Sequence, residues 1–240
     1  MSVLQPRLPD DYGALGASEA MRYIAACDYR ENNEYWSVAD QIVNGIETST
    51  SRPIIVDIGC GPGTLCECLR DLRADMVVVG VDESEPMLSH AREKYPLCTF
   101  IKGSAESLPL LSDSVDGVVS INTLHHLPDV DRVISEMLRV LRPNGLGYLV
   151  DLRRDAQASE VEKKLRRMHD GVAADLKRSL RSALTPREMV QLLKDKAITN
   201  LRVECGPIVS MSTELQNDPF KHEDDWPIYY RAIFRKYRSV

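Results

Sequence analysis

The chain has 240 residues, of which 43% are hydrophobic and 28% are charged, and its formal net charge is −6. This length is enough for one large or two small domains, and the hydrophobic content supports a full core. The acidic balance argues against a general nucleic-acid binder, and no apolar run is long enough to span a membrane.

The start of the chain lacks the basic region and apolar stretch that are typical of a secretory signal, so we expect a cytoplasmic protein. Its six cysteines show no pattern of a small disulfide-stapled domain. Cys66 falls at the expected start of a helix, where a thiol is sensitive to oxidation if it is exposed, but a buried structural thiol is the favoured interpretation.

The predicted elements alternate along the first two thirds of the chain. Residues 17–46 are expected to form one or two helices, followed by a Ser/Thr-rich linker at 47–52. Apolar β-branched runs predict strands near 53–58, 76–81, 98–102, 115–121 and 145–151. Helices are predicted between them, near 64–74, 84–95 and 129–142. This alternation is typical of an α/β fold with a parallel sheet and helices on both faces.

The remaining chain is expected to add helices and two more strands. A long helical stretch is predicted at about 158–182, and a second helix begins with Thr185 as its cap and Pro186 in its first turn. Strands are expected near 200–205 and 228–236, which would bring the sheet to seven strands.

The segment from Ile54 to Thr64, I-I-V-D-I-G-C-G-P-G-T, is the most informative part of the sequence. An apolar run ends in Asp57, and glycines follow at positions 59, 61 and 63. A strand that enters a helix through a glycine turn brings bare backbone against a ligand. A P-loop would need Lys-Ser/Thr after its last glycine, and Asp57 would repel a pyrophosphate. S-adenosylmethionine, which has an ammonium and a sulfonium but no phosphate, fits the carboxylate best.

A second acid supports this interpretation. The apolar run from Met76 to Val81 ends at Asp82 and Glu83, about twenty residues beyond the glycines. A carboxylate at the end of this second strand can accept hydrogen bonds from both hydroxyls of a ribose. The two motifs in this order predict a nucleoside-type cofactor.

The chain resembles the class I S-adenosylmethionine-dependent methyltransferases. The resemblance lies in the segments at 56–64, 81–88, 103–110, 113–127 and 141–146, and it covers roughly residues 53–151. It is closest to the branch of small-molecule enzymes of ubiquinone and menaquinone biosynthesis. It implies a Rossmann-like, mostly parallel seven-stranded sheet with helices on both faces and S-adenosyl-L-methionine as the cofactor.

The resemblance also implies roles for single residues. Asp57 and the three glycines (Gly59, Gly61 and Gly63) would surround the methionine part of the cofactor. Asp82 and Glu83 would lie at the ribose, and Met87 would pack under the adenine, although a core methionine is an equal alternative. Ser104 and Ala105 would border the adenine edge. Many relatives have an acid in place of Ser104, so the exocyclic amine would be recognised here by backbone groups or by the hydroxyl.

These expectations give one methyltransferase domain over residues 1–240. Residues 17–46 would form an N-terminal helical lid, 53–151 the cofactor-binding core, 152–199 a helical cover, and 200–240 the last strands. Methyl transfer from a sulfonium needs an aligned acceptor and exclusion of water, so the two helical segments are expected to close over the strand ends.

The acceptor side is predicted less sharply. The loop S-I-N-T-L-H-H-L-P-D at 120–129 would face the transferred methyl, with Asn122 beside the cofactor. His125 or His126 could accept a proton as general base, while two structural loop histidines are the alternative. Asp151, at the end of the fifth predicted strand, could also line the pocket. Adjacent histidines without a third ligand make a poor metal site, so no metal is expected. Tyr12, Tyr29, Tyr35 and Trp36 could supply aromatic walls.

Three functions remain open. The favoured one is methylation of a small-molecule acceptor, with no membrane or nucleic-acid partner. A methyltransferase acting on RNA or protein is the alternative, with a basic cluster as its contact: Lys163, Lys164, Arg166, Arg167, Lys177, Arg178 and Arg181. An amphipathic cover helix explains the same cluster. The third is a cofactor-binding protein without catalysis. The acceptor, the methylated atom and the oligomeric state are not predicted.

Overall fold

A computed structural model describes residues 7–8, 16–28, 33–48, 50–166, 170–205 and 228–237. The helices are α1 (Ala17–Asp28), α2 (Asn33–Gly45), α3 (Thr64–Leu72), α4 (Glu85–Lys94), η1 (Leu124–His126), α5 (Val130–Val140), α6 (Ala158–Leu165), α7 (Asp170–Ser182) and α8 (Pro186–Lys194). The strands are β1 (Ile54–Ile58), β2 (Val77–Asp82), β3 (Thr99–Lys102), β4 (Val115–Ile121), β5 (Leu141–Leu152), β6 (Ile198–Cys205) and β7 (Tyr229–Lys236). η1 is a single 3-10 turn.

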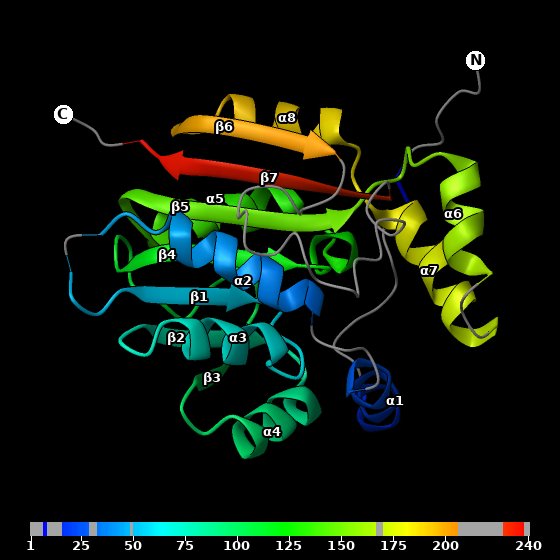
Figure 1. The fold of residues 1–240 in the computed structure, drawn as a ribbon. Coiled ribbons are helices and arrows are strands. Elements are labelled where there is room, and N and C mark those ends of the chain that lie inside the picture. The colour runs from blue at the N-terminus through cyan, green and yellow to red at the C-terminus, as the bar shows by residue number, and fades with distance from the viewer. Residues whose placement is uncertain are drawn as a thin grey trace, which may run out of the picture.

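The strands of the described residues form one seven-stranded sheet in the order β3-β2-β1-β4-β5-β7-β6. The strands from β3 to β5 pair in parallel, whereas β7 is antiparallel to both of its neighbours, β5 and β6 (Figure 1). The order reverses at β1 and β4, and open α/β sheets bind ligands beyond the carboxyl ends of the strands at such a point. The predicted α/β fold with a mostly parallel seven-stranded sheet is confirmed.

Helices bury both faces of the sheet. On one face, α2 and α3 pack over the middle strands, with Ala39, Ile42 and Leu69 wholly buried. On the other face, the apolar stripe of α5 (Val133, Ile134, Met137) and Met189 of α8 lie in a second core cluster with the inward residues of β4 and β7. The near-continuous apolar strands seen in the sequence are those of a sheet that is covered on both sides.

Three helices gather at the carboxyl edge of the parallel strands. In Figure 1 the arrowheads of β1 and β5 point toward the side where α1, α6 and α7 lie. α1 packs on α4 through Ala20, Ile24 and Met87, which form a small buried cluster. These helices belong to the segments that were predicted to cover the cofactor, whereas α2, in the same predicted lid as α1, lies mainly on the sheet face.

Several boundaries differ from the prediction. The helical stretch expected at 158–182 is two helices, α6 and α7. β5 begins at Leu141 and not near residue 145, and its pairing with β4 shifts register between Val115 and Gly117. The capped helix at Thr185 is confirmed as α8, where Thr185 and Glu188 form a reciprocal capping box.

The basic cluster is largely a solvated helix face. Exposed Lys163, Arg166 and Arg178 pair with acids one turn away on their own helices, Glu160, Glu162 and Asp175. Lys164 departs from the prediction, because it is buried with its Nζ 5.3 Å from the centre of the Tyr229 ring. Arg167 lies outside the described residues. Within the described part of the chain, no helix has the length and apolarity that crossing a membrane requires.

Candidate cofactor and acceptor site

The glycine turn between β1 and α3 is built around left-handed backbone. Gly59 has a φ of +68° and Gly61 a φ of +51°, a region that side chains disfavour. A Cβ at Gly59 would lie 2.2 Å from Thr123 Cγ2, so protein packs directly on that glycine. At Gly61 nothing lies within 4 Å of an added Cβ. The backbone at Gly61 therefore faces open space, as expected where a ligand approaches it.

A cavity lies beside this turn. The end of β1, the turn and the start of α3 supply Asp57, Gly59, Cys60, Gly61, Pro62 and Leu65, and the end of β4 and the loop after it supply Ile121 and Asn122. Tyr23 of α1 and Tyr35 of α2 complete the lining. Of the predicted aromatic residues, Tyr35 thus reaches the cavity, whereas Trp36 is partly exposed at the surface and Tyr12 and Tyr29 lie outside the described residues.

Asp57 carries a buried carboxyl group at the floor of the cavity. It is 3% exposed, and the Cys66 thiol donates a hydrogen bond to Oδ2 over 3.5 Å. Burial raises the pKa of Asp57 to about 7; the bond from Cys66 lowers it and the charge of Asp82 raises it. A cation placed in the cavity would favour the ionised carboxylate. Cys66 itself is fully buried, in agreement with a structural thiol.

Asp82 ties the glycine turn to the end of β2. Its Oδ2 accepts a bond from the Gly61 backbone N–H at 2.9 Å, and its Oδ1 accepts one from Ser84 N–H at 2.8 Å. Burial raises the pKa of Asp82, although these N–H donors act in the opposite direction. Each carboxylate oxygen can accept a second bond, so capacity remains for hydroxyl donors. The adjacent Glu83 is exposed.

Asn122 presents an unsatisfied acceptor. Its backbone is left-handed, with a φ of +54°, and its N–H donates to Val150 O at 2.9 Å. Its buried side-chain Oδ1 accepts no hydrogen bond from the residues that the structure describes. Buried polar atoms nearly always have a partner, so a ligand with an N–H or O–H group is the natural donor here.

The remaining predicted cofactor contacts lie around the same edge of the sheet. Met87 is 2% exposed and packs against Ala20 and Ile24 of α1, which is the core arrangement. Ser104 and Ala105 follow β3, next to Gly103, whose N–H donates to Asp82 O at 3.0 Å. The Ser104 hydroxyl accepts a bond from Glu106 N–H at 3.3 Å, and Ala105 is buried.

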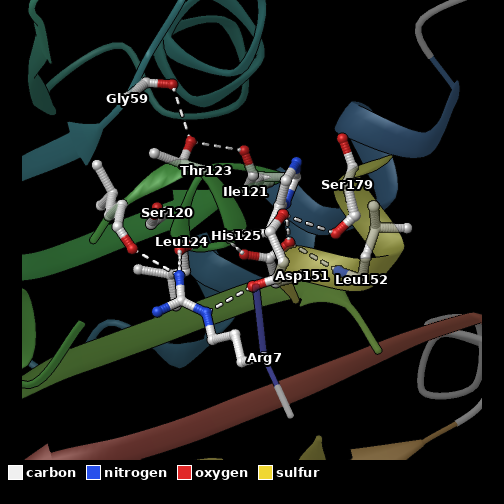
Figure 2. A network of polar contacts seen from close by, with 12 residues as sticks. Arg7, Gly59, Ser120, Ile121, Thr123, Leu124, His125, Asp151, Leu152 and Ser179 are labelled. Carbon is white, nitrogen blue, oxygen red and sulfur yellow. Dashed lines mark hydrogen bonds and ion pairs between the residues drawn. The ribbon is translucent and has the colours of Figure 1, made fainter. Parts of the chain in front are cut away.

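His125 and Asp151 form a buried pair. His125 Nδ1 lies 2.5 Å from Asp151 Oδ1, and the His125 backbone N–H donates to Asp151 Oδ2 at 2.9 Å (Figure 2). A carboxylate only accepts, so Nδ1 carries a hydrogen, and in the neutral form of the ring the lone pair is on Nε2. The side chains are 5% and 2% exposed, and neither lines the cavity described above. His125 is three residues after Asn122 in the same loop, and Asp151 is in the neighbouring strand β5.

His126 lies beside His125 but in a different environment. The ring centroids are 3.9 Å apart and the ring planes are tilted by 49°. Burial lowers the pKa of His126 to about 3, and the neighbouring His125 acts in the same direction. His126 is thus neutral near pH 7 and a weak base, so the two histidines differ in the chemistry that they can do.

Sequence reasoning missed Tyr23 and Thr123. The Thr123 hydroxyl donates to Gly59 O at 3.2 Å and to Ile121 O at 3.1 Å, which fastens the loop after β4 to the glycine turn. No local motif marks these residues, because their contacts depend on how α1 and η1 pack. Within the described residues no group of three or more His, Cys, Asp or Glu side chains could hold a metal ion.

Comparison with known proteins identifies the segment that contains the glycine turn. Residues 56–149 match the model of the methyltransferase domain family. The chain contains a methyltransferase domain. This domain is of the class I S-adenosylmethionine-dependent type that the motifs indicated, and S-adenosylmethionine is the cofactor of that type.

Curated relatives resemble this domain over part of their length. The chain is 36% identical to a probable S-adenosylmethionine-dependent methyltransferase of Mycolicibacterium smegmatis over 38% of this chain and 35% of the relative. It is 30% identical to a ubiquinone biosynthesis O-methyltransferase of Mesorhizobium japonicum over 50% of this chain and 52% of the relative. The matches therefore span about half the length of these relatives or less.

Solved structures extend the fold similarity beyond the methyltransferase domain. A plantazolicin methyltransferase, crystallised with a triazolic desmethyl analogue of plantazolicin and S-adenosylhomocysteine, superimposes with a TM-score of 0.72. The sequence identity is 19%, and the match covers 90% of this chain and 91% of that one. The whole described architecture is thus a methyltransferase fold.

Proposed function

We propose that this protein is an S-adenosylmethionine-dependent methyltransferase that methylates a small-molecule acceptor by in-line displacement. The observation that carries the proposal is the bare backbone at Gly61 facing a cavity that also contains the buried carboxyl of Asp57. The relatives named for quinone biosynthesis support a small acceptor.

The described residues fit the cofactor. Asp57 and the Asn122 Oδ1 are acceptors for its ammonium group, and Asp82 has free acceptor capacity for ribose hydroxyls. Gly61 leaves room for the ligand to approach the backbone. When bound, the sulfonium supplies an electrophilic methyl group. Tyr23 and Tyr35 restrict water on the open side of the cavity.

We further propose His125 as the general base. Asp151 fixes its ring and the tautomer that leaves Nε2 free to take a proton from an acceptor hydroxyl, thiol or amine. His126 is disfavoured for this role, because a pKa of about 3 makes it a weak base. Asp151 acts as the positioning residue and does not contact the acceptor.

Replacing His125 by glutamine is expected to slow methyl transfer by about 10²-fold or more, because the proton acceptor is lost. Affinity for S-adenosylhomocysteine should stay unchanged, since His125 does not line the cofactor cavity. Single-turnover rates and calorimetry measure the two quantities. The matched control is His126→Gln, for which a much smaller loss is expected. Equal rates for His125→Gln and the native protein would remove the general base from the proposal.

A macromolecular acceptor is less well supported. The basic cluster that would contact it is partly neutralised by acids on its own helices, and Lys164 is buried. The closing segments are proposed to be α1, α6 and α7, which lie at the carboxyl edge, and not α2, whose apolar side is part of the core.

The test of the function is transfer of a labelled methyl group. The purified protein is incubated with methyl-labelled S-adenosylmethionine and, in separate reactions, with fractionated metabolites, RNA and protein extract. Label in a metabolite fraction, identified by mass spectrometry, is the expected result. Label in the RNA or protein arm would overturn the small-molecule proposal. Binding of S-adenosylhomocysteine without any product would indicate a non-catalytic protein.

A further inference from the structure

Arg7 joins two parts of the fold that are distant in the sequence. Its Nε donates to Ser182 O at 2.6 Å, and one terminal nitrogen donates to Leu127 O at 2.6 Å. Longer bonds of 3.4 Å reach the carbonyl oxygens of Leu124 and Pro128. Figure 2 shows the side chain of Arg7 close to Leu124, His125 and Asp151. One guanidinium thus donates to carbonyls of two separate segments, the end of α7 and the residues around η1.

The Ser182 carbonyl needs a donor from outside its own helix. Ser182 ends α7, and the last carbonyls of a helix have no donor within the helix and favour a nearby cation. Leu124 and Leu127 flank the two histidines in and after η1. The backbone N–H of the next residue, Leu8, also donates to Arg181 O at 3.3 Å, so the chain at 7–8 lies along the end of α7.

The charge of Arg7 also faces the His125–Asp151 pair. The Arg7 side chain is half-buried, and burial lowers its pKa while the nearby Asp151 raises it. Asp151 of β5 binds the ring and the backbone N–H of His125, and Arg7 binds the carbonyls of Leu124 and Leu127, which come before and after His125 in the chain. The loop after β4 is therefore fixed by two independent sets of bonds.

We propose that Arg7 is a positioning residue, which clamps the loop carrying His125 against the end of α7 and thereby fixes the acceptor side of the site. The claim that Arg7 fixes the loop depends only on the contacts of Arg7. The claim that this affects catalysis rests on the function proposed above. Arg7 then contributes to the site, although it is far in the sequence from every methyltransferase motif.

Hydrogen exchange tests without any acceptor whether Arg7 fixes the loop. In Arg7→Gln saturated with S-adenosylhomocysteine, the amides of residues 125–127 should exchange about tenfold faster, because two short hydrogen bonds are lost. Amides of β1 should keep their protection, and affinity for S-adenosylhomocysteine should not change. Arg22→Gln, at an exposed position on α1, is the matched control. Native exchange rates at 125–127 in Arg7→Gln would overturn the proposal.

Arg7→Lys separates positioning from general loss of stability. Lysine keeps the charge but cannot donate in the planar geometry of a guanidinium, so intermediate exchange rates are expected. With an acceptor in hand, Arg7→Gln should lower kcat about tenfold while the KM for the cofactor stays constant, and Arg7→Lys should recover part of the rate. The positioning role would be overturned if Arg7→Gln changed kcat and the KM for the cofactor equally and Arg7→Lys did not recover part of the rate. Failure of the native protein to bind S-adenosylhomocysteine would instead contradict the proposed function.

Discussion

Replacing Asp57 by asparagine is expected to weaken binding of S-adenosylhomocysteine about 100-fold, because a charge-assisted bond to a buried ligand ammonium is lost. The carboxyl group of Asp57 is 3% exposed, and burial raises its pKa to about 7 in the free protein. A bound cation favours the ionised form, so binding below pH 7 must release a proton. Titration calorimetry in buffers of different ionisation enthalpy measures both the affinity and this proton.

The pKa of Asp57 predicts how ligand affinity and protein stability each change with pH. Affinity for S-adenosylhomocysteine should rise as the pH increases toward 7 and level off above that value, since Asp57 is then already ionised. The stability of the free protein should move in the opposite direction. The pKa of Asp57 is higher in the folded protein than in the unfolded chain, where it is about 4. The folded protein therefore becomes less stable as the pH rises from about 4 to about 7. Asp57→Asn should remove both effects.

Asp116→Asn is the matched control for this experiment. Asp116 is also a buried acid, but it lies at the start of β4 and binds Arg142, Thr48 and the N–H of Ile54. Its replacement should lower the melting temperature and leave proton release on ligand binding intact. Native affinity and proton release in Asp57→Asn would show that Asp57 does not face the ligand ammonium.

A comparison of Gly61→Ala with Gly59→Ala is expected to separate ligand binding from folding. At Gly61 the added methyl group enters open space beside the cavity, so the protein tolerates it apart from a backbone strain of about 1–2 kcal/mol. The same methyl occupies volume that the ligand needs, and affinity for S-adenosylhomocysteine should fall at least tenfold. At Gly59 the methyl would lie 2.2 Å from Thr123 Cγ2, and the larger loss should appear in thermal stability.

Calorimetry and thermal denaturation of both variants check this prediction. A drop in melting temperature that is larger for Gly59→Ala than for Gly61→Ala confirms the packing argument. Gly61→Ala with native ligand affinity would contradict the assignment of the open space to the cofactor. Both variants add the same methyl group to left-handed backbone, so each serves as the control for the other.

The residues proposed to hold the cofactor could be selected from the sequence because they are close together in the chain. Asp57 and the glycines occupy one strand end and one turn, and Asp82 ends the neighbouring strand. The strands themselves were predictable because both faces of the sheet are covered, which requires continuous apolar runs. The break between α6 and α7 was missed, since residues compatible with a helix occur throughout that stretch.

The acceptor side could not be resolved in the same way. His125 and His126 are adjacent, and only the contact with Asp151 and the burial of His126 distinguish them. Arg7 and Thr123 act through backbone carbonyls, which carry no sequence signal. The sequence predicted equally that Met87 packs under the adenine or in the protein core. Its contact with α1 depends on where that helix lies, which the sequence does not indicate.

The position of β7 has a consequence for how the chain is assembled. β7 is the last strand in chain order, yet it lies between β5 and β6, which are both synthesised earlier. Until β7 inserts, β5 has an unpaired edge and β6 has no neighbour in the sheet, and such edges recruit other chains. We therefore expect the nascent polypeptide to stay prone to aggregation, and to need chaperones, until the segment that contains β7 has left the ribosome.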